Sequence, residues 1–297
     1  MAKDDTVLIS EPPAAHPDES PWGGHLLDLD AYLGRTGYTG PRAATLACLR
    51  SVARAHLAAI PFENVDVALG RDVSLDLADI QHKLVRSGRG GYCFEHNLLF
   101  AAVLERFGLP VTRLLARVRQ GRPTVRYRAH TTLLVEAEGR TYLTDVGFGA
   151  EGPLAPLPLA HCATVTVGGF QWRLVREGDQ WVLQSLHDDG WFDLYSFRLE
   201  RHHSVDFDVS NFYTAHHPRS TFTGKLVAMR GDEAVQRTLT NGSLHLRHAD
   251  GRTELVHLSA DEAIEALRET FAVRLGDSDA RSLKERLSTS SSSVQEA

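Results

Sequence analysis

The chain has 297 residues and a formal net charge of −6, from 32 Lys and Arg against 38 Asp and Glu. This mildly acidic balance argues against nucleic acid as the main partner. Hydrophobic residues make up 42% and charged residues 24%, as in an ordinary globular protein whose core needs neither disulfides nor a metal. Because we find no apolar stretch of membrane-spanning length and no signal-peptide pattern, we expect a cytoplasmic protein without a membrane partner.

Both ends of the chain are polar and of low complexity. Residues 1–24 include four prolines, and a run of four serines lies within residues 288–297. Such compositions do not support a packed core. We therefore expect a flexible N-terminal extension over 1–24 and a disordered tail over 288–297.

The first ordered region, residues 25–110, favours helices. Apolar residues recur at helical spacing over 27–33, 46–57 and 94–107, and each of the last two runs ends shortly before a proline. A spacing of three or four residues places apolar side chains on one face of a helix. This region is expected to form a helical bundle.

Strand patterns dominate residues 111–200 and then mix with a late helix. The strands expected in the first of these stretches are 111–118, 131–135, 141–146, 171–175, 181–184 and 191–197. Those expected afterwards are 226–230, 234–239, 243–248 and 253–258. A helix should begin near Ser259, because Ser259 and Glu262 fit a capping box. We place the two later domains at 111–215 and 216–287.

The richest local pattern surrounds Cys93, in the run SGRGGYCFEHN. Gly90 and Gly91 permit a tight turn, and an apolar helical run follows. Cys93 is therefore expected at the mouth of a helix, where free N–H groups and the helix dipole favour a thiolate. The alternative is an unreactive core cysteine. The glycines and the three polar residues after Phe94 favour a functional role.

A thiolate nucleophile needs a base, and the base needs a group that orients it. His130 and Asp145 lie 15 residues apart in a segment with the pattern of a β-hairpin, centred between Ala137 and Glu138. A turn at that centre places the two side chains opposite each other, or one step off, on neighbouring strands. A carboxylate so placed can hold an imidazole. With Cys93, this pair predicts a Cys-His-Asp site.

Two other interpretations use the same residues. Cys93-x-x-His96 has the spacing of half a zinc site, but a second pair at matching spacing is missing from the sequence, so we expect no metal. Cysteine peptidases and transglutaminase-like enzymes also use Cys, His and Asp in this order. The three residues alone do not distinguish hydrolysis from transfer.

Longer segments resemble the arylamine N-acetyltransferase family. They are LDLDAYLGRTGYTGPRAATLACLRSVARAHLAAIPFENVDV, RGGYCFEHN, the hairpin segment that ends in DVGFG, and HHPRSTF. They occur in the family's order at similar spacing, over about residues 26–230. The resemblance implies an α+β fold in which a helical bundle, a β-barrel and an α/β lid surround a papain-like Cys-His-Asp core. The order of elements described above agrees with this architecture.

The same resemblance implies an enzyme that moves an acetyl group from acetyl-CoA to the nitrogen of arylamines, arylhydrazines or hydrazides. Acetyl-CoA would be a co-substrate, with no permanently bound cofactor. The reaction would be ping-pong through an acetyl-cysteine intermediate. Cys93 would be the nucleophile, His130 the base and Asp145 the group that orients it.

Other residues are assigned by their positions in the family's motifs. Those that resemble the aromatic lining of the acceptor pocket are Phe62, Phe148 and Phe222. Those at positions where relatives approach the CoA arm are Gly149, Ser220 and Thr221. Glu63 and Arg89 resemble a buried ion pair beneath the site. We expect this pair to brace the turn that carries Cys93.

Three alternatives stay open for the function. Some relatives are amide synthases that release a polyketide chain as a macrolactam from a carrier protein. A peptidase would need an open groove for an extended chain. A non-catalytic binding module would not need an intact Cys, His and Asp.

Overall fold

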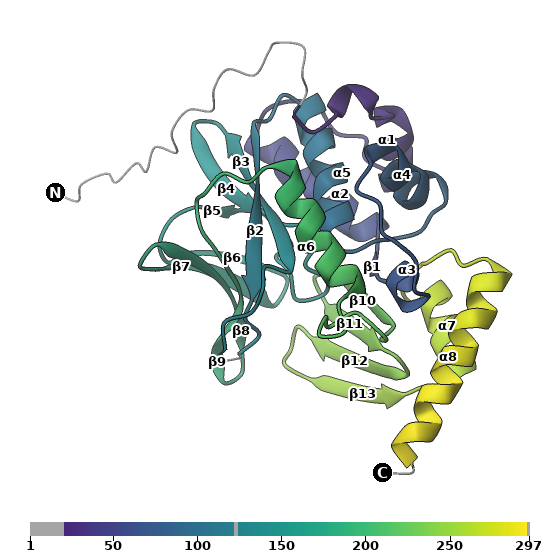
Figure 1. The fold of residues 1–297 in the computed structure, drawn as a ribbon. Coiled ribbons are helices and arrows are strands. Elements are labelled where there is room, and N and C mark those ends of the chain that lie inside the picture. Colours follow the sequence, from purple (N-terminus) through teal and green to yellow (C-terminus); the bar gives the residue numbers. More distant parts are fainter. Residues whose placement is uncertain (1–20, 122–123, 296–297) are drawn as a thin grey trace.

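The computed structural model describes residues 21–121 and 124–295, with side chains as far as residue 289. Figure 1 shows helices from the N-terminal third, a strongly curved sheet from the middle and a second sheet with two helices from the C-terminal third. The expected extension lies outside the described residues over 1–20. Within residues 21–24, the Trp22 indole N–H donates to the Val111 carbonyl at 3.3 Å.

The helical part is built around α5 (Cys93–Arg106). Its other elements are η1 (Gly24–Leu26), α1 (Leu29–Thr36), α2 (Leu46–Ala59), α3 (Val65–Ala68), α4 (Leu77–Ile80) and the π-helical turn η2 (Gln81–Arg86). The side chains of Asp28 and Thr45 accept N–H groups of the first turns of α1 and α2, which fixes where these helices begin. Eleven of the fourteen residues of α5 are buried. The helix that starts at Cys93 therefore runs through the interior.

The middle part is one antiparallel sheet of eight strands in the order β5-β4-β3-β2-β9-β8-β7-β6. Its strands are β2 (Val111–Val118), β3 (His130–Ala137), β4 (Arg140–Thr144), β5 (Leu157–Pro158), β6 (Ala163–Val167), β7 (Phe170–Glu177), β8 (Gln180–His187) and β9 (Gly190–Phe197). The two edge strands follow each other in the chain, so the sheet curls into a nearly closed barrel (Figure 1). Trp172, Leu183 and Tyr195 fill its interior. The six expected strands are confirmed, whereas the short β5 and the half-exposed β6 had no clear pattern.

The turn between β3 and β4 shifts the expected register by one residue. Glu138 and Gly139 have positive φ angles of 52° and 71°, as in the two-residue turns favoured by hairpins. Leu133 pairs with Thr144. In this register His130 and Asp145 are diagonal neighbours, two positions away from direct opposition, and an offset of two keeps both side chains on one face. The expected opposition is therefore wrong, although the two residues do meet.

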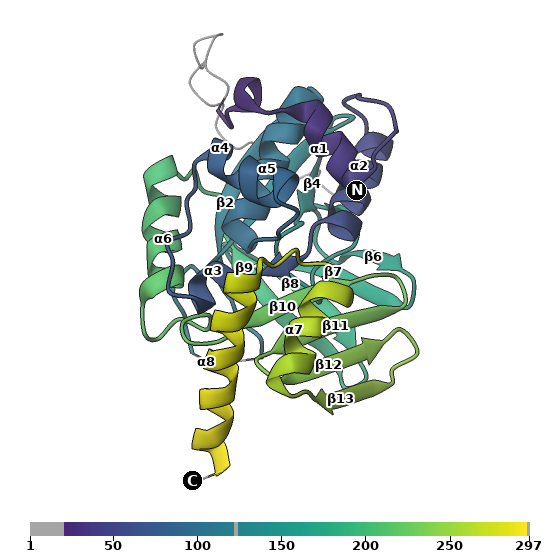
Figure 2. The ribbon, with the colours of Figure 1, turned by 90° about the vertical axis from the view of Figure 1, so that its right-hand side faces the viewer.

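The C-terminal part is a five-stranded antiparallel sheet in the order β1-β10-β11-β12-β13. Its strands are β1 (Phe62–Glu63), β10 (Val227–Gly231), β11 (Val235–Thr240), β12 (Ser243–His248) and β13 (Thr253–His257). The helices α7 (Ala260–Glu269) and α8 (Asp277–Gln295) pack against one face of it (Figure 2). The capping box is confirmed, since the Ser259 N–H donates to Glu262 Oε2 at 2.7 Å. β1 comes from the helical part, so this sheet ties the first and last parts together.

Helix α6 (Ser204–His216) lies between barrel and lid and was not predicted from the sequence. It also crosses the boundary expected between residues 215 and 216. Val209 and Phe212 are exposed, while Asn211 and Thr214 are buried. This reversal of the usual pattern removes the apolar face by which a helix is recognised in a sequence.

Helix α8 continues to Gln295, through most of the tail expected over 288–297. The hydroxyls of Ser288 and Thr289 donate to carbonyls one turn earlier, so these polar residues continue the helix. Residues 296–297 lie outside the described residues. Among the described helices, none is long and apolar enough to cross a membrane.

We predict that Leu283→Ala destabilises the lid. Leu283 is 1% exposed in the core between α8, α7 and the sheet, so its truncation should cost about 2–5 kcal/mol in free energy of unfolding. Lys284→Ala is the matched control, because its ion pair with Asp261 is exposed and should contribute less than about 0.5 kcal/mol. Urea unfolding measures both. Equal losses would contradict the packing described for α8.

Candidate active site

Cys93 is the first residue of α5 and is 3% exposed, so the predicted place at a helix mouth is confirmed. Two close approaches hold it there. A Cβ on Gly90 would overlap the Pro61 carbonyl oxygen, and a Cβ on Gly147 would lie 2.8 Å from the Cys93 Cα. Only glycine fits at these points. The sulfur thus lies at the N-terminal end of the buried helix α5, where free N–H groups favour negative charge.

His130 and Asp145 meet at the end of the β3–β4 hairpin. His130 Nε2 lies 2.6 Å from Asp145 Oδ2, and both side chains are buried. Asp145 Oδ1 accepts the Gly147 N–H at 2.9 Å and Asn97 Nδ2 at 3.1 Å. Since Asp145 engages Nε2, Nδ1 is the ring nitrogen left to hydrogen-bond Cys93. The three residues predicted from sequence are brought together in this order.

The pair shifts both pKa values in the direction that favours an ion pair. Burial lowers the pKa of His130, but the charge and hydrogen bond of Asp145 outweigh burial and raise it to about 10. Burial raises the pKa of Asp145, but His130 and the Asn97 and Gly147 hydrogen bonds bring it below its ordinary value. The imidazole is therefore protonated at neutral pH.

The two shifts also set a pH window for stability. The raised pKa of His130 contributes stability that is complete below about pH 6.5 and is lost as the pH rises through about 10. The lowered pKa of Asp145 contributes stability that is complete above its ordinary value and is lost as the pH falls through the lowered one. Around neutral pH both contributions are largely retained.

The sequence analysis missed two side chains of this site. Asn97 holds Asp145 from α5, and its signal is its place one turn after Cys93 on the same helix face. Tyr195 of β9 packs on His130, with ring centroids 4.7 Å apart. No local pattern marks Tyr195, because the pairing of β9 with β2 brings it to the site.

A pocket of about 220 Å³ opens over Cys93 and His130. Its lining includes the three aromatic residues that the resemblance assigned to an acceptor pocket: Phe62, Phe148 and Phe222. The rings of Phe62 and Phe222 are 5.9 Å apart, and that of Phe148 lies 5.1 Å from His130. The pocket combines an aromatic wall with a floor of sulfur and imidazole.

The three residues assigned to the CoA arm occupy different places. Thr221 is among the described residues that line the pocket, whereas Gly149 and Ser220 are not. The Ser220 hydroxyl donates to the Thr214 carbonyl at 2.6 Å and accepts the Phe222 N–H at 3.2 Å. Ser220 therefore orders the turn that presents Phe222 to the pocket.

This geometry can be compared with known proteins. Residues 45–280 match a family model described as N-acetyltransferase. The arylamine N-acetyltransferase of Escherichia coli (strain K12) is 39% identical over 222 residues, which are 74% of this chain and 78% of that protein. The chain belongs to the arylamine N-acetyltransferase family.

Solved structures of the family have the same fold. The arylamine N-acetyltransferase of Nocardia farcinica is 40% identical with a TM-score of 0.85, covering 90% of this chain and 98% of that one. The Mycobacterium marinum arylamine N-acetyltransferase in complex with CoA is 35% identical with a TM-score of 0.82, covering 88% and 98%. The α+β fold and the enzyme class expected from the sequence are thereby confirmed.

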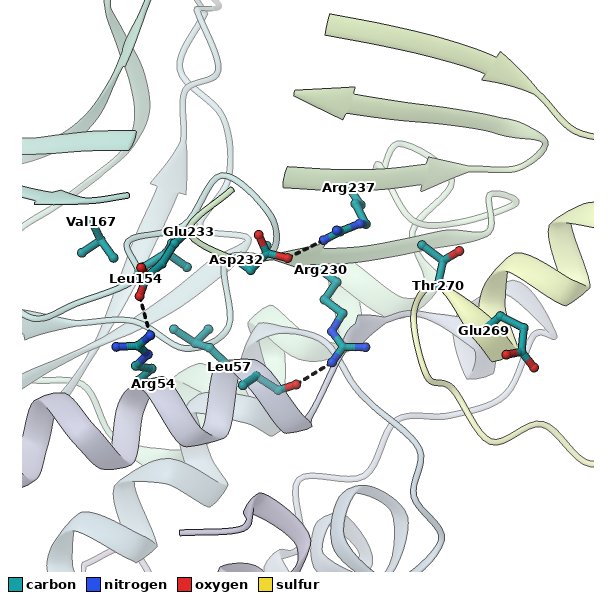
Figure 3. A pocket seen from close by; sticks show the side chains of 12 residues that line it. Arg54, Leu57, Leu154, Val167, Arg230, Asp232, Glu233, Arg237, Glu269 and Thr270 are labelled. Carbon is teal, nitrogen blue, oxygen red and sulfur yellow. Dashed lines mark hydrogen bonds and ion pairs between the residues drawn. The ribbon is translucent and has the colours of Figure 1, made fainter. Parts of the chain in front are cut away.

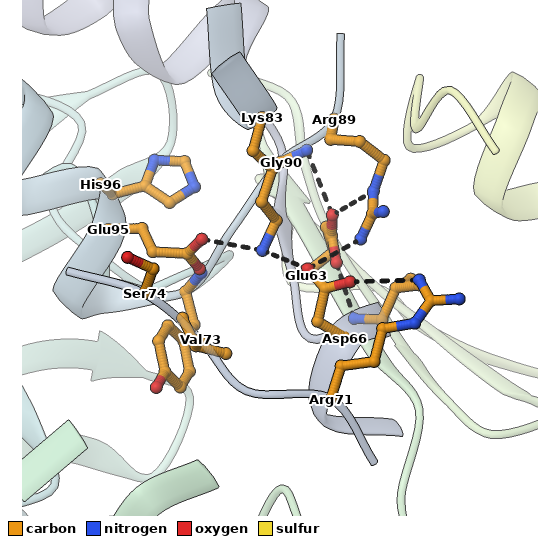
Figure 4. A network of polar contacts seen from close by, with 12 residues as sticks. Glu63, Asp66, Arg71, Val73, Ser74, Lys83, Arg89, Gly90, Glu95 and His96 are labelled. Carbon is orange, nitrogen blue, oxygen red and sulfur yellow. Dashed lines mark hydrogen bonds and ion pairs between the residues drawn. The ribbon is translucent and has the colours of Figure 1, made fainter. Parts of the chain in front are cut away.

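Behind the pocket floor, this member of the arylamine N-acetyltransferase family holds a buried network of charged side chains (Figure 4). Arg89 Nε donates to Glu63 Oε1 at 2.8 Å, and Glu63 is fully buried. The same oxygen accepts the Gly90 N–H at 3.2 Å. Burial lowers the pKa of Arg89, but Glu63 raises it above its ordinary value. The predicted pair is therefore joined to the turn that precedes Cys93.

Lys83 extends the network to the start of α5 (Figure 4). Its Nζ lies 2.7 Å from Glu95 Oε1 and 2.6 Å from Asp66 Oδ2. Glu95 Oε2 accepts the Tyr92 N–H at 3.1 Å, which caps the helix. Burial lowers the pKa of Lys83, but the surrounding carboxylates raise it above its ordinary value. Lys83 and Asp66 were not among the predicted residues, because nothing in a sequence separates them from surface charges.

A series of buried hydrogen bonds crosses the helical bundle and ends at the Pro61 carbonyl. Tyr32 Oη lies 2.9 Å from His56 Nδ1, His56 Nε2 lies 2.9 Å from His96 Nδ1, and His96 Nε2 lies 3.1 Å from the Pro61 carbonyl. Because the carbonyl can only accept, every other group in the series must donate toward it. Both ring nitrogens of His96 are used here, which leaves Cys93-x-x-His96 without a metal-binding role.

A second hollow of about 470 Å³ lies where α2 meets the lid and the barrel (Figure 3). Arg54 pairs with Glu233 at 2.5 Å, and Arg230 Nη2 donates to the Ala58 carbonyl at 2.7 Å. The residues predicted from sequence do not appear among the described residues that line it. Its polar contacts hold the lid against the helical bundle.

We predict that His96→Gln weakens the acid sensitivity of the fold. Burial lowers the pKa of His96 to about 4, against an ordinary value of 6.5. Between these values the unfolded chain binds a proton that the folded chain does not, so stability falls as the pH falls, by about 1.4 kcal/mol per pH unit. Glutamine can keep both hydrogen bonds without titrating. Urea unfolding at pH 6 and pH 5 should show a smaller slope for the variant. An unchanged slope would mean that His96 is not buried in its neutral form.

We predict that Asp145→Asn lowers the pKa of His130 from about 10 to near or below its ordinary value, because burial remains and the opposite charge is lost. NMR titration of the His130 ring protons measures this shift. Acetylation of Cys93 at pH 7 should slow by about 10³-fold or more, as expected when a carboxylate no longer stabilises the imidazolium. Asp250→Asn, in a surface turn, is the control and should change neither value.

Proposed function

We propose that this protein transfers an acetyl group from acetyl-CoA to the nitrogen of arylamines, arylhydrazines or hydrazides, in a ping-pong reaction through acetyl-Cys93. The proposal depends on one observation: Cys93, His130 and Asp145 meet beneath a phenylalanine-lined pocket. The names of the relatives support the reaction, and the CoA complex of the Mycobacterium marinum protein supports the donor.

In the first half-reaction, the Cys93 thiolate attacks the thioester carbon of acetyl-CoA. The bond from that carbon to the CoA sulfur breaks, and the departing sulfur takes the proton from His130 Nδ1. The Cys93 N–H is at the first position of α5, where backbone donors have no partner within the helix. It can therefore donate to the oxyanion of the tetrahedral intermediate. One such donor is typically worth roughly 3–4 kcal/mol in the transition state.

In the second half-reaction, the acceptor nitrogen attacks the carbonyl carbon of acetyl-Cys93. Neutral His130 takes the proton that this nitrogen loses. The carbon–sulfur bond breaks and returns the Cys93 thiolate beside a protonated His130. Asp145 keeps its charge throughout, which holds the imidazole in place and stabilises its protonated form.

The pocket walls fit a flat acceptor. Phe62, Phe148 and Phe222 line the pocket and offer apolar surface to an aromatic ring. An amino or hydrazine nitrogen on that ring can then reach the carbon bound to the Cys93 sulfur. The aromatic walls thus select acceptors, and the polar floor carries out the transfer.

The lid supplies the cover that an acyl-enzyme needs. Water competes with the amine for acetyl-Cys93, so the site must limit its access. The lid side of the pocket consists of Phe222, Val227, Met229 and Thr240, together with Thr221 and Lys225. With CoA or the acceptor bound, these residues would complete the enclosure.

The proposed donor is acetyl-CoA, and the proposed compartment is the cytoplasm. Acetyl-CoA is a co-substrate in this scheme, and no resident cofactor takes part. Thr221 is the residue best placed to approach the pantetheine arm, because it lines the pocket. Cys48, Cys93 and Cys162 are free thiols, which supports the cytoplasm as the compartment.

We predict that acetyl-CoA without an acceptor adds about 42 Da to Cys93, the mass of an acetyl group that replaces the thiol hydrogen, because the acyl-enzyme then has no amine to react with. Peptide mass mapping locates the group. Cys93→Ala should abolish transfer to aniline and hydrazine acceptors.

Cys48→Ala and Cys162→Ala are the matched controls and should keep both the adduct and the activity. Acetylation of another cysteine, or transfer by Cys93→Ala, would refute the proposal. A donor series of longer acyl thioesters tests the amide synthase alternative. Preference for a long chain on a carrier protein over acetyl-CoA would replace the proposed donor.

A further inference from the structure

Arg113 of β2 is 5% exposed and takes no part in the steps described above. Its Nε donates to Thr131 Oγ1 at 3.1 Å, and its Nη2 donates to the Phe94 carbonyl at 3.1 Å. The guanidinium carbon lies 4.0 Å from the centre of the Phe207 ring on α6. A buried arginine is thus held between β3, α5 and α6.

Both acceptors belong to residues that directly follow the reacting ones. Phe94 follows Cys93, and Thr131 follows His130. Arg113 is paired with Leu133 across β2 and β3, so Thr131 is its diagonal neighbour on the same face. One rigid, planar guanidinium therefore joins the first turn of α5 to the start of β3.

Within the described part of the chain, no carboxylate is hydrogen-bonded to Arg113. The hydrogen bonds found for its side chain in the described part of the chain go to a hydroxyl and a carbonyl. Burial lowers its pKa to about 9, and the two groups that favour its charged form are Cys93 and Asp208. An uncompensated cation is costly to bury. A thiolate at Cys93 would offset that cost.

We propose that Arg113 is a positioning residue for the acetylation of Cys93: its two hydrogen bonds fix the nucleophile relative to the base, and its positive charge favours the thiolate. This inference rests on the proposed function, because it concerns the first half-reaction. Among the described residues, His130 of β3 hydrogen-bonds the sulfur, and the charge of Cys93 also acts on the pKa of Tyr92 at the helix N-cap. Arg113 adds a second cation from β2.

Two variants separate the effect of the positive charge from the effect of the two hydrogen bonds to Thr131 and Phe94. Arg113→Met keeps an unbranched side chain and removes both, while Arg113→Lys keeps a charge without the fork that spans two acceptors. Arg119→Met is the control, since Arg119 lies just beyond β2 in partly exposed ion pairs with Glu177 and Asp193. Each variant is assayed for single-turnover acetylation by acetyl-CoA and for alkylation by iodoacetamide between pH 5 and 9.

We expect Arg113→Met to acetylate at least tenfold more slowly and to need about one pH unit more to reach half-maximal alkylation, a tenfold change in the ionisation equilibrium. Arg113→Lys should recover most of the alkylation midpoint but remain slow in acetylation. The second half-reaction, followed as kcat/KM for an arylamine, should change less than twofold. Arg119→Met should match the unmodified protein.

An Arg113→Met protein with native circular dichroism and unchanged alkylation midpoint and acetylation rate would overturn the inference. If Arg113→Met does not fold, the Lys variant decides: slow acetylation with a native spectrum supports the role, and an unchanged rate refutes it. Alkylation needs no acyl donor. It therefore tests Arg113 even if the unmodified protein takes no acetyl group, which is the result that would reject the proposed function instead.

Discussion

The site depends on one constraint: α5 begins inside the protein, so every charge at its start must be balanced by protein groups. Glu95 caps the helix and is met by Lys83, and the turn before Cys93 is held by Glu63. Removing one member of such a network leaves a buried charge without its partner, which costs more than the intact pair contributes. This balance allows a sulfur anion and an imidazolium to coexist beneath the pocket.

The three parts of the chain each contribute something the others lack. The bundle contributes the sulfur at a helix terminus, the barrel contributes His130 and Asp145 on a rigid hairpin, and the lid contributes Phe222 to the acceptor wall. Rigid strands hold catalytic groups more exactly than loops do. The aromatic wall is instead shared between segments distant in the chain, so acceptor preference can change while the reacting groups stay in place.

Much of this arrangement could be predicted from local sequence. Cys93 was identified by its glycines and helical run, and the β3–β4 hairpin brought His130 to Asp145, although the turn at Glu138 moved the register by one residue. Local sequence patterns did not identify residues that reach the site through pairing of strands distant in the chain. Tyr195 reaches the imidazole only through the pairing of β9 with β2. Helix α6 has exposed apolar and buried polar residues, so its hydrophobic pattern pointed away from a helix.

The two-residue strand β1 has a mechanical consequence. Phe62 pairs with Met229 and Glu63 with Ala228, and Asn64 continues the join through hydrogen bonds to Val227. A rigid-body rotation of the lid away from the helical bundle would break these backbone hydrogen bonds and would displace Phe62 from the pocket wall. Rotation of individual side chains at the pocket breaks none of these bonds. The main chain thus keeps Phe62 in register with the lid, and side-chain rotation is the movement that can widen the entrance while this join stays intact.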